Sequence, residues 1–136
     1  MNKKKLITLA MILTLLLTST AFAYAEVQSR ETDIVTFNIE RTSRTSAAAT
    51  VTISFAARVD KYDVTMYLQK KVDGVWVSDT TNDDYLLKNT GSGSQRFIFN
   101  HIYSDLKSGV NYRLKCVSKD TIDGSSYTLT CYSNQF

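Results

Sequence analysis

The sequence has few of the residues on which enzyme chemistry depends. Among its 136 residues there is a single histidine, His101, which any Ser–His–Asp or Cys–His site would have to use. No nucleophile-elbow motif is present, and no two acids stand out as a pair for sugar hydrolysis. We therefore predict no catalytic residue, and we interpret His101 as a partly buried or surface histidine near a strand end. A small hydrolase is the least favoured class of function.

Candidate metal ligands are sparse as well. Asp79, Asn82, Asp83 and Asp84 lie in one loop and offer oxygen atoms that Ca²⁺ accepts as ligands. Their spacing lacks the central glycine of an EF-hand loop, so we prefer to interpret them as a solvated polar loop. The sequence accordingly predicts no metal site and no cofactor.

Residues 1–25 have the features of a signal peptide rather than of a membrane anchor. Three lysines (Lys3, Lys4 and Lys5) precede an apolar run over 6–17, and small residues place the cleavage site after Ala23 or Ala25. The apolar run is shorter than the ~20 residues that span a bilayer. We expect a protein that is exported and keeps no membrane anchor after cleavage.

Without residues 1–25 the chain has no excess of positive charge. The whole chain holds 16 basic and 13 acidic residues, and the first 25 contain three lysines and no acid, so 13 of each remain. A chain with balanced charge lacks the excess of basic residues that is typical of proteins that bind nucleic acids or anionic membranes. We predict no nucleic-acid partner.

Residues 26–32 read as a flexible leader, and residues 33–136 as a single all-β domain. Apolar side chains recur every second residue, without proline, and no segment shows a sustained helical period. About seven strands are expected, which favours an antiparallel two-sheet sandwich. The clearest runs are 35–39, 49–57 with Ala57 facing inward, 61–72, 75–80, 95–103, 112–117 and 127–131. We expect a polar loop over 81–94, and in the run 95–103 we prefer Phe97 and Phe99 as the inward pair over Ile98 and Ile102.

Two Asp-Gly pairs predict two-residue hairpin turns. Asp73-Gly74 separates two alternating runs and would place Lys71 opposite Trp76. Asp123-Gly124 would likewise place Cys116 opposite Cys131 on the inward face. In an exported domain this pair predicts a disulfide, although counting from the turn makes it a hydrogen-bonded pair, which suits a bridge less well. The alternative is two buried free thiols packed as small apolar groups.

The stretch 106–117, with Leu106, Gly109 and Tyr112 before alternating apolar residues, resembles the entry to the sixth strand of fibronectin type III domains. This resemblance implies a fibronectin-III-like or immunoglobulin-like sandwich in which Tyr112 is a corner tyrosine. The chain departs from the family at Phe55, where a tryptophan is usual, and at Ser108, where a proline is usual. It is also similar to small exported β-sandwich proteins of Gram-positive bacteria, which implies an extracellular location and no particular reaction.

One outward face collects flat rings and hydrogen-bonding side chains. The predicted registers place the following residues on it: Tyr67, Gln69, Trp76, Arg113, Lys115 and Tyr132. Such a face suits binding an extracellular protein or a glycan, although cross-strand aromatic and basic pairs also stabilise ordinary solvated sheets. The favoured function is a secreted, non-enzymatic binding module. A secreted antagonistic, bacteriocin-like polypeptide is the alternative, and the sequence does not define the oligomeric state.

Overall fold

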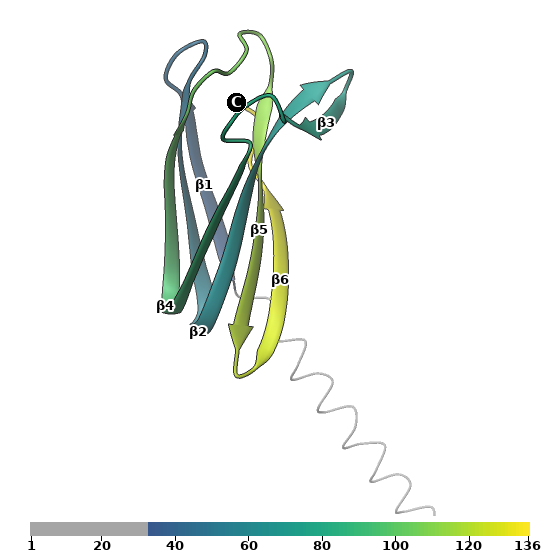
Figure 1. Cartoon of the computed structure of the whole chain (residues 1–136). Helices are drawn as coiled ribbons and strands as arrows, with labels where there is room; N and C mark the ends of the chain where they lie inside the picture. The colour runs from purple at the N-terminus through teal and green to yellow at the C-terminus, as the bar shows by residue number, and fades with distance from the viewer. Residues whose placement is uncertain (1–32) are drawn as a thin grey trace, which may run out of the picture. The chain divides into compact units, whose positions relative to one another are not determined.

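Every regular element in residues 33–136, the part of the chain that the computed structural model describes, is a β-strand. The predicted signal peptide and leader lie outside these residues. All strand pairs are antiparallel (Figure 1). The strands are β1 (Ile34–Arg41), β2 (Ala47–Val72), β3 (Val75–Ser78), β4 (Leu86–Tyr103), β5 (Tyr112–Ile122) and β6 (Ser125–Tyr132). No helix in the described part of the chain is long and apolar enough to span a bilayer.

The long strand β2 pairs with different neighbours along its length. Residues 47–54 lie between β1 and the second half of β4, whereas residues 61–70 lie between the first half of β4 and β5. The β2–β4 register shifts between Ser54 and Val59. The two separately predicted strands 49–57 and 61–72 are therefore one continuous strand, and six strands are found in place of seven.

The register shift also reverses which side chains of β2 are buried. Over 47–55 the odd-numbered residues face the core, and Val51 and Ile53 are fully buried; over 62–68 the even-numbered ones do, and Met66 and Leu68 are fully buried. Side chains alternate with a period of two, so an irregularity in pairing is what allows one strand to change its buried parity. The predicted inward position of Ala57 is wrong, because Ala57 is exposed within the irregular stretch.

The predicted loop over 81–94 is also wrong from residue 86 onward. Residues 86–94 form the first half of β4 and pair with residues 59–67 of β2. Gly91 lies opposite Tyr62, whose ring occupies the space that a side chain at Gly91 would need. Glycine, serine and asparagine are poor strand formers, so this segment reads as a loop until its neighbour is known to cover it.

Both predicted hairpin turns are confirmed. Asp73 and Gly74 have φ angles of 50° and 79°, and Asp123 and Gly124 have 49° and 78°, as the tight two-residue turn requires. The registers that these turns set pair Lys71 with Trp76 and Cys116 with Cys131.

The predicted disulfide between Cys116 and Cys131 is not formed, although the two residues lie directly opposite each other. Both thiols are free. Counting from the Asp-Gly turn makes them a hydrogen-bonded pair, a cross-strand position that suits a bridge less well than a non-hydrogen-bonded one. Burial, and then the nearby Cys131, raise the pKa of Cys116 to about 12, and burial also raises the pKa of Cys131. These are protonated thiols at neutral pH, packed as small apolar groups.

Two further predictions about the core are confirmed. Phe97 and Phe99 point inward, whereas Ile98 and Ile102 are 49% and 68% exposed. Tyr112 is fully buried, and its hydroxyl accepts a 2.8 Å hydrogen bond from the backbone N–H of Lys107. This contact fastens the turn before β5 to the core and thereby fixes the position of β5.

Candidate functional site

The outward side chains of β2 fall on two separate faces. We call the outward side chains of β1, of residues 47–54 and of residues 96–103 the β1 face. We call the outward side chains of β3, β5, β6, of residues 61–71 and of residues 86–92 the β5 face. The six residues predicted to share one face all belong to the β5 face, because the registers of β2 with β3 and of β5 with β2 and β6 bring them together.

Arg113 is the centre of this group. Its guanidinium carbon lies 4.6 Å from the ring centroid of Trp76 and 4.2 Å from that of Tyr132. Its Nε donates a 2.8 Å hydrogen bond to Oε1 of Gln69, the residue directly opposite on β2. A cation so close to two rings is attracted by both, and the hydrogen bond holds it in that place. The arrangement is a preformed set of two rings and a charged donor.

Two lysines make similar contacts beside it. Nζ of Lys115 lies 5.4 Å from the ring centroid of Tyr67, its direct cross-strand partner. Nζ of Lys71 lies 5.6 Å from the ring centroid of Trp76. Each aromatic side chain of the predicted group is thus in contact with a cation. Tyr132 is 49% exposed, and the other five predicted residues are half-buried against one another.

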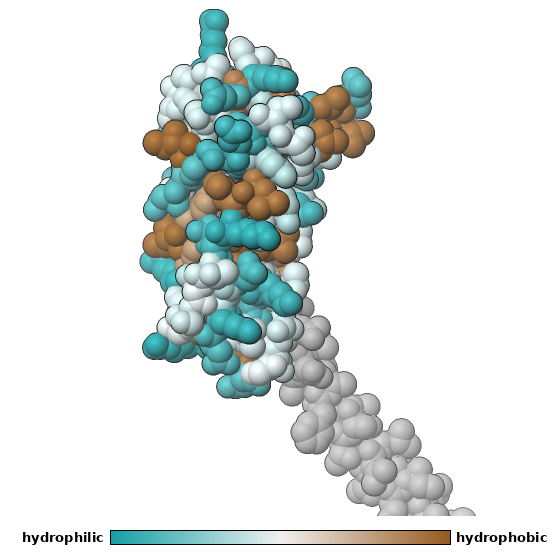
Figure 2. All heavy atoms as spheres, in the orientation of Figure 1, coloured by the Kyte–Doolittle hydropathy of each residue, from teal (hydrophilic) through white to brown (hydrophobic). Residues whose placement is uncertain are grey.

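The β3 hairpin adds an apolar edge next to Trp76. Val72, Val75 and Val77 are all exposed there. Figure 2 shows this hairpin projecting from the body of the domain with hydrophobic side chains on its surface. Because β3 has only four residues and pairs with β2 alone, Trp76 sits on an element with a single neighbouring strand.

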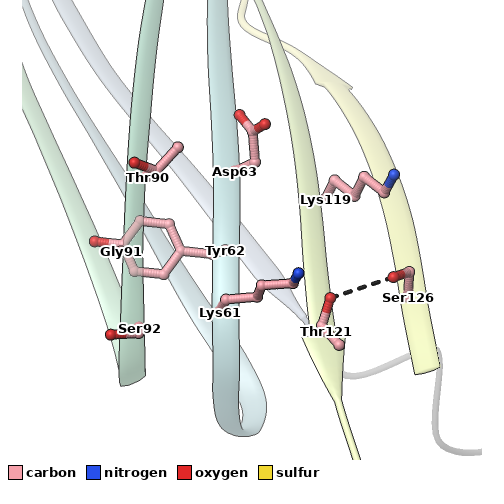
Figure 3. A pocket seen from close by; sticks show the side chains of 9 residues that line it. All are labelled: Lys61, Tyr62, Asp63, Thr90, Gly91, Ser92, Lys119, Thr121 and Ser126. Carbon is pink, nitrogen blue, oxygen red and sulfur yellow. Dashed lines mark hydrogen bonds between the residues drawn. The ribbon is translucent and has the colours of Figure 1, made fainter. Parts of the chain in front are cut away.

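A hollow of about 490 Å³ lies on the same face, around residues 61–63 in the middle of β2 and away from the β3 hairpin (Figure 3). Its lining residues come from β2, β4, β5 and β6: Lys61, Tyr62, Asp63, Thr90, Gly91, Ser92, Lys119, Thr121 and Ser126. The Thr121 and Ser126 hydroxyls are hydrogen-bonded at 3.2 Å across β5 and β6. The sequence prediction missed this hollow because it assigned Thr90 and Ser92 to a loop. Residues 88–92 are all polar or glycine, so the sequence carries no alternation there that would have indicated a strand.

No protein-family model matches the chain, and no characterised protein is significantly similar to it. The site must therefore be interpreted from its own geometry.

Two acids in the interior have opposite electrostatic environments, and neither belongs to the β5 face. Burial of Asp79 opposes its ionisation, but hydrogen bonds from Thr81 and Lys70, together with the Lys70 charge at 3.0 Å, outweigh this and lower the pKa of Asp79. Burial raises the pKa of Asp120, and the charge of Asp33 adds to the rise. One carboxylate oxygen of Asp120 is buried without a hydrogen-bond partner.

The polar loop before β4 is held together by its own contacts. The Asn82 amide donates to the Ser104 carbonyl at 2.8 Å and its oxygen accepts from the Asp84 N–H, while Oδ2 of Asp84 lies 2.9 Å from Nε2 of His101. His101 is half-buried near the end of β4. Among residues 33–136, no three His, Cys, Asp or Glu side chains are grouped closely enough to hold a metal ion.

Proposed function

We propose that this chain is a secreted, non-enzymatic binding module that holds an extracellular protein or a glycan on its β5 face. The fold that we propose for it is a two-sheet sandwich of the fibronectin type III kind. The division of β2 and β4 between two sets of neighbours and the buried Tyr112 with its backbone hydrogen bond support this architecture.

The observation that carries the proposal is the Trp76–Arg113–Tyr132 stack with Gln69 and the Tyr67–Lys115 pair beside it. Aromatic rings provide flat contact area at a small entropy cost, and they are enriched where proteins bind partners. Arginine and glutamine add hydrogen-bonding groups in fixed positions. A ligand that lies across these side chains meets a surface that is ordered before it binds, which lowers the entropic cost of binding.

The proposal is tested with alanine at Trp76 and Tyr67, assayed on an array of bacterial cell-wall glycans, host glycans and extracellular proteins. We expect each variant to weaken binding at least about tenfold, as loss of a central aromatic contact does. The melting temperature should change by no more than about 4 °C, because both rings are partly exposed. Ile98→Ala on the β1 face is the matched control and should bind as the wild type does.

A lower melting temperature with unchanged binding would assign the rings to structure alone. Inhibition of bacterial growth by the purified protein, without binding to the array, would instead favour the antagonistic polypeptide.

A further inference from the structure

The β5 face has a strong excess of positive charge, although residues 26–136 hold equal numbers of basic and acidic side chains. Six cations point outward from it, and Asp63 is its single carboxylate. The cations are Lys61, Lys71, Lys88, Arg113, Lys115 and Lys119. The β1 face, by contrast, carries one residue of each sign, Glu40 and Arg96. The six cations of the β5 face lie on strands, whereas most acidic residues in the described part of the chain lie in turns and loops.

None of the cations of the β5 face forms an ion pair with a described residue, although Asp63 lies directly opposite Lys119. The two ion pairs in residues 33–136 are Lys70–Asp79 and His101–Asp84, and neither lies on this face. Like charges on adjacent strands repel one another, so such a face has a cost in folding that an anionic ligand would relieve. Lys61 and Lys119, which line the hollow in Figure 3, are diagonal neighbours, with α-carbons about 7–8 Å apart.

From this charge distribution we propose that the ligand of the β5 face is an anionic polysaccharide. The inference rests on the proposed function and narrows its ligand class. Hydroxyl groups stand among the cations and match the many hydroxyl groups of a sugar chain: Thr90, Ser92, Thr121, Ser126, Thr128 and Thr130. A chain with one acid per sugar would place its negative charges along the rows of lysines while its hydroxyl groups bond to the threonines.

A protein ligand fits this face less well. Lysine is depleted in the buried centres of protein–protein interfaces, yet five of the six cations here are lysines.

The test measures binding of the purified protein to polygalacturonate by calorimetry, with neutral dextran and single-stranded DNA as the comparison polymers. We expect polygalacturonate to bind and dextran not to bind. Affinity should fall by about tenfold or more between low salt and 0.3 M NaCl, because exposed charges are screened. The double variant K61Q/K119Q should weaken binding about tenfold, since each exposed pair contributes modestly. Arg96→Gln on the β1 face removes one positive charge as a matched control and should change nothing.

Equal binding of dextran, tighter binding of DNA, or full binding by K61Q/K119Q would overturn the inference. These measurements also distinguish failure of the anionic-ligand inference from failure of the binding-module proposal. If Trp76→Ala abolishes binding of a neutral glycan or a protein that K61Q/K119Q still binds, the binding module stands and the anionic ligand is wrong. If neither variant affects binding of any array component, both proposals fall.

Discussion

The same two strands, β2 and β4, build both outward faces of the described domain, and the two faces differ sharply. On the β1 face they contribute mainly small or β-branched neutral residues such as Thr50, Thr52 and Ile98. On the β5 face they contribute lysines and Tyr67 beside the Arg113 stack. The change occurs within residues 56–61, around the register shift, and beyond it the even-numbered side chains of β2 are buried in place of the odd-numbered ones. A local irregularity in pairing thus decides which side chains of a continuous strand meet solvent.

The largest expected effect is on the free energy of unfolding, when buried residues in the two halves of β2 are truncated. Ile53 and Leu68 are both fully buried, one at an odd and one at an even position. Ile53→Ala and Leu68→Ala should each lower the free energy of unfolding by about 2–5 kcal/mol, measured by urea denaturation. Thr52→Ala and Gln69→Ala, their outward neighbours, should cost less than about 1 kcal/mol. If Gln69→Ala proves as costly as Leu68→Ala, β2 does not change its buried side.

A smaller effect is expected at residues 86–94 of β4, for which the sequence predicts a loop. Gly91→Ala would force a methyl group into the Tyr62 ring, which is itself held by Phe55 and Phe97. Such overpacking should lower the free energy of unfolding by about 1–3 kcal/mol. Ser92→Ala, at the next and outward-facing position, is the control and should have little effect. Tolerance of alanine at Gly91 would show that residues 86–94 do not pair with β2 as described.

The smallest effect concerns Asp79 and Asp120, whose contributions to the stability of the folded state should depend on pH in opposite ways. Because the pKa of Asp79 is lowered in the folded state, its contribution to stability is present above its unfolded pKa of about 3.9 and is lost as pH falls. The pKa of Asp120 is raised, so its contribution is present below about pH 3.9 and is lost as pH rises through the folded value.

Asp79→Asn should therefore cost about 1.5 kcal/mol at pH 7 and less at pH 3, since a hydrogen-bonded charge is lost. Asp120→Asn should stabilise the protein at pH 7 by on the order of 1 kcal/mol relative to its effect at pH 3. Denaturation curves at the two pH values measure both. The effect of each substitution on the free energy of unfolding should change with pH in opposite directions for the two variants. A change in the same direction would contradict the two environments described.

The hairpin turns and the cross-strand registers next to them could be predicted from short sequence patterns. The Asp-Gly pairs required positive φ at two successive residues, and that alone set the registers of Lys71 with Trp76 and of Cys116 with Cys131. These registers also predicted the members of the Arg113 group. The redox state of the cysteine pair was not predicted correctly, because facing each other in register does not bring two sulfur atoms into bonding geometry.

The sequence by itself determined that residues 33–136 form antiparallel strands, where the hairpins turn and which side chains of each short run share a face, because these follow from a period of two and from glycine's backbone freedom. Only the tertiary structure decided that 86–94 is a strand and that β2 is continuous and changes its buried side. It also decided that one face is basic although the charges of residues 26–136 balance. Each of these features depends on a neighbour that is distant in sequence, such as Tyr62, whose ring covers Gly91. The physical reason is that cross-strand packing stabilises strand pairing more than the intrinsic propensity of the residues does.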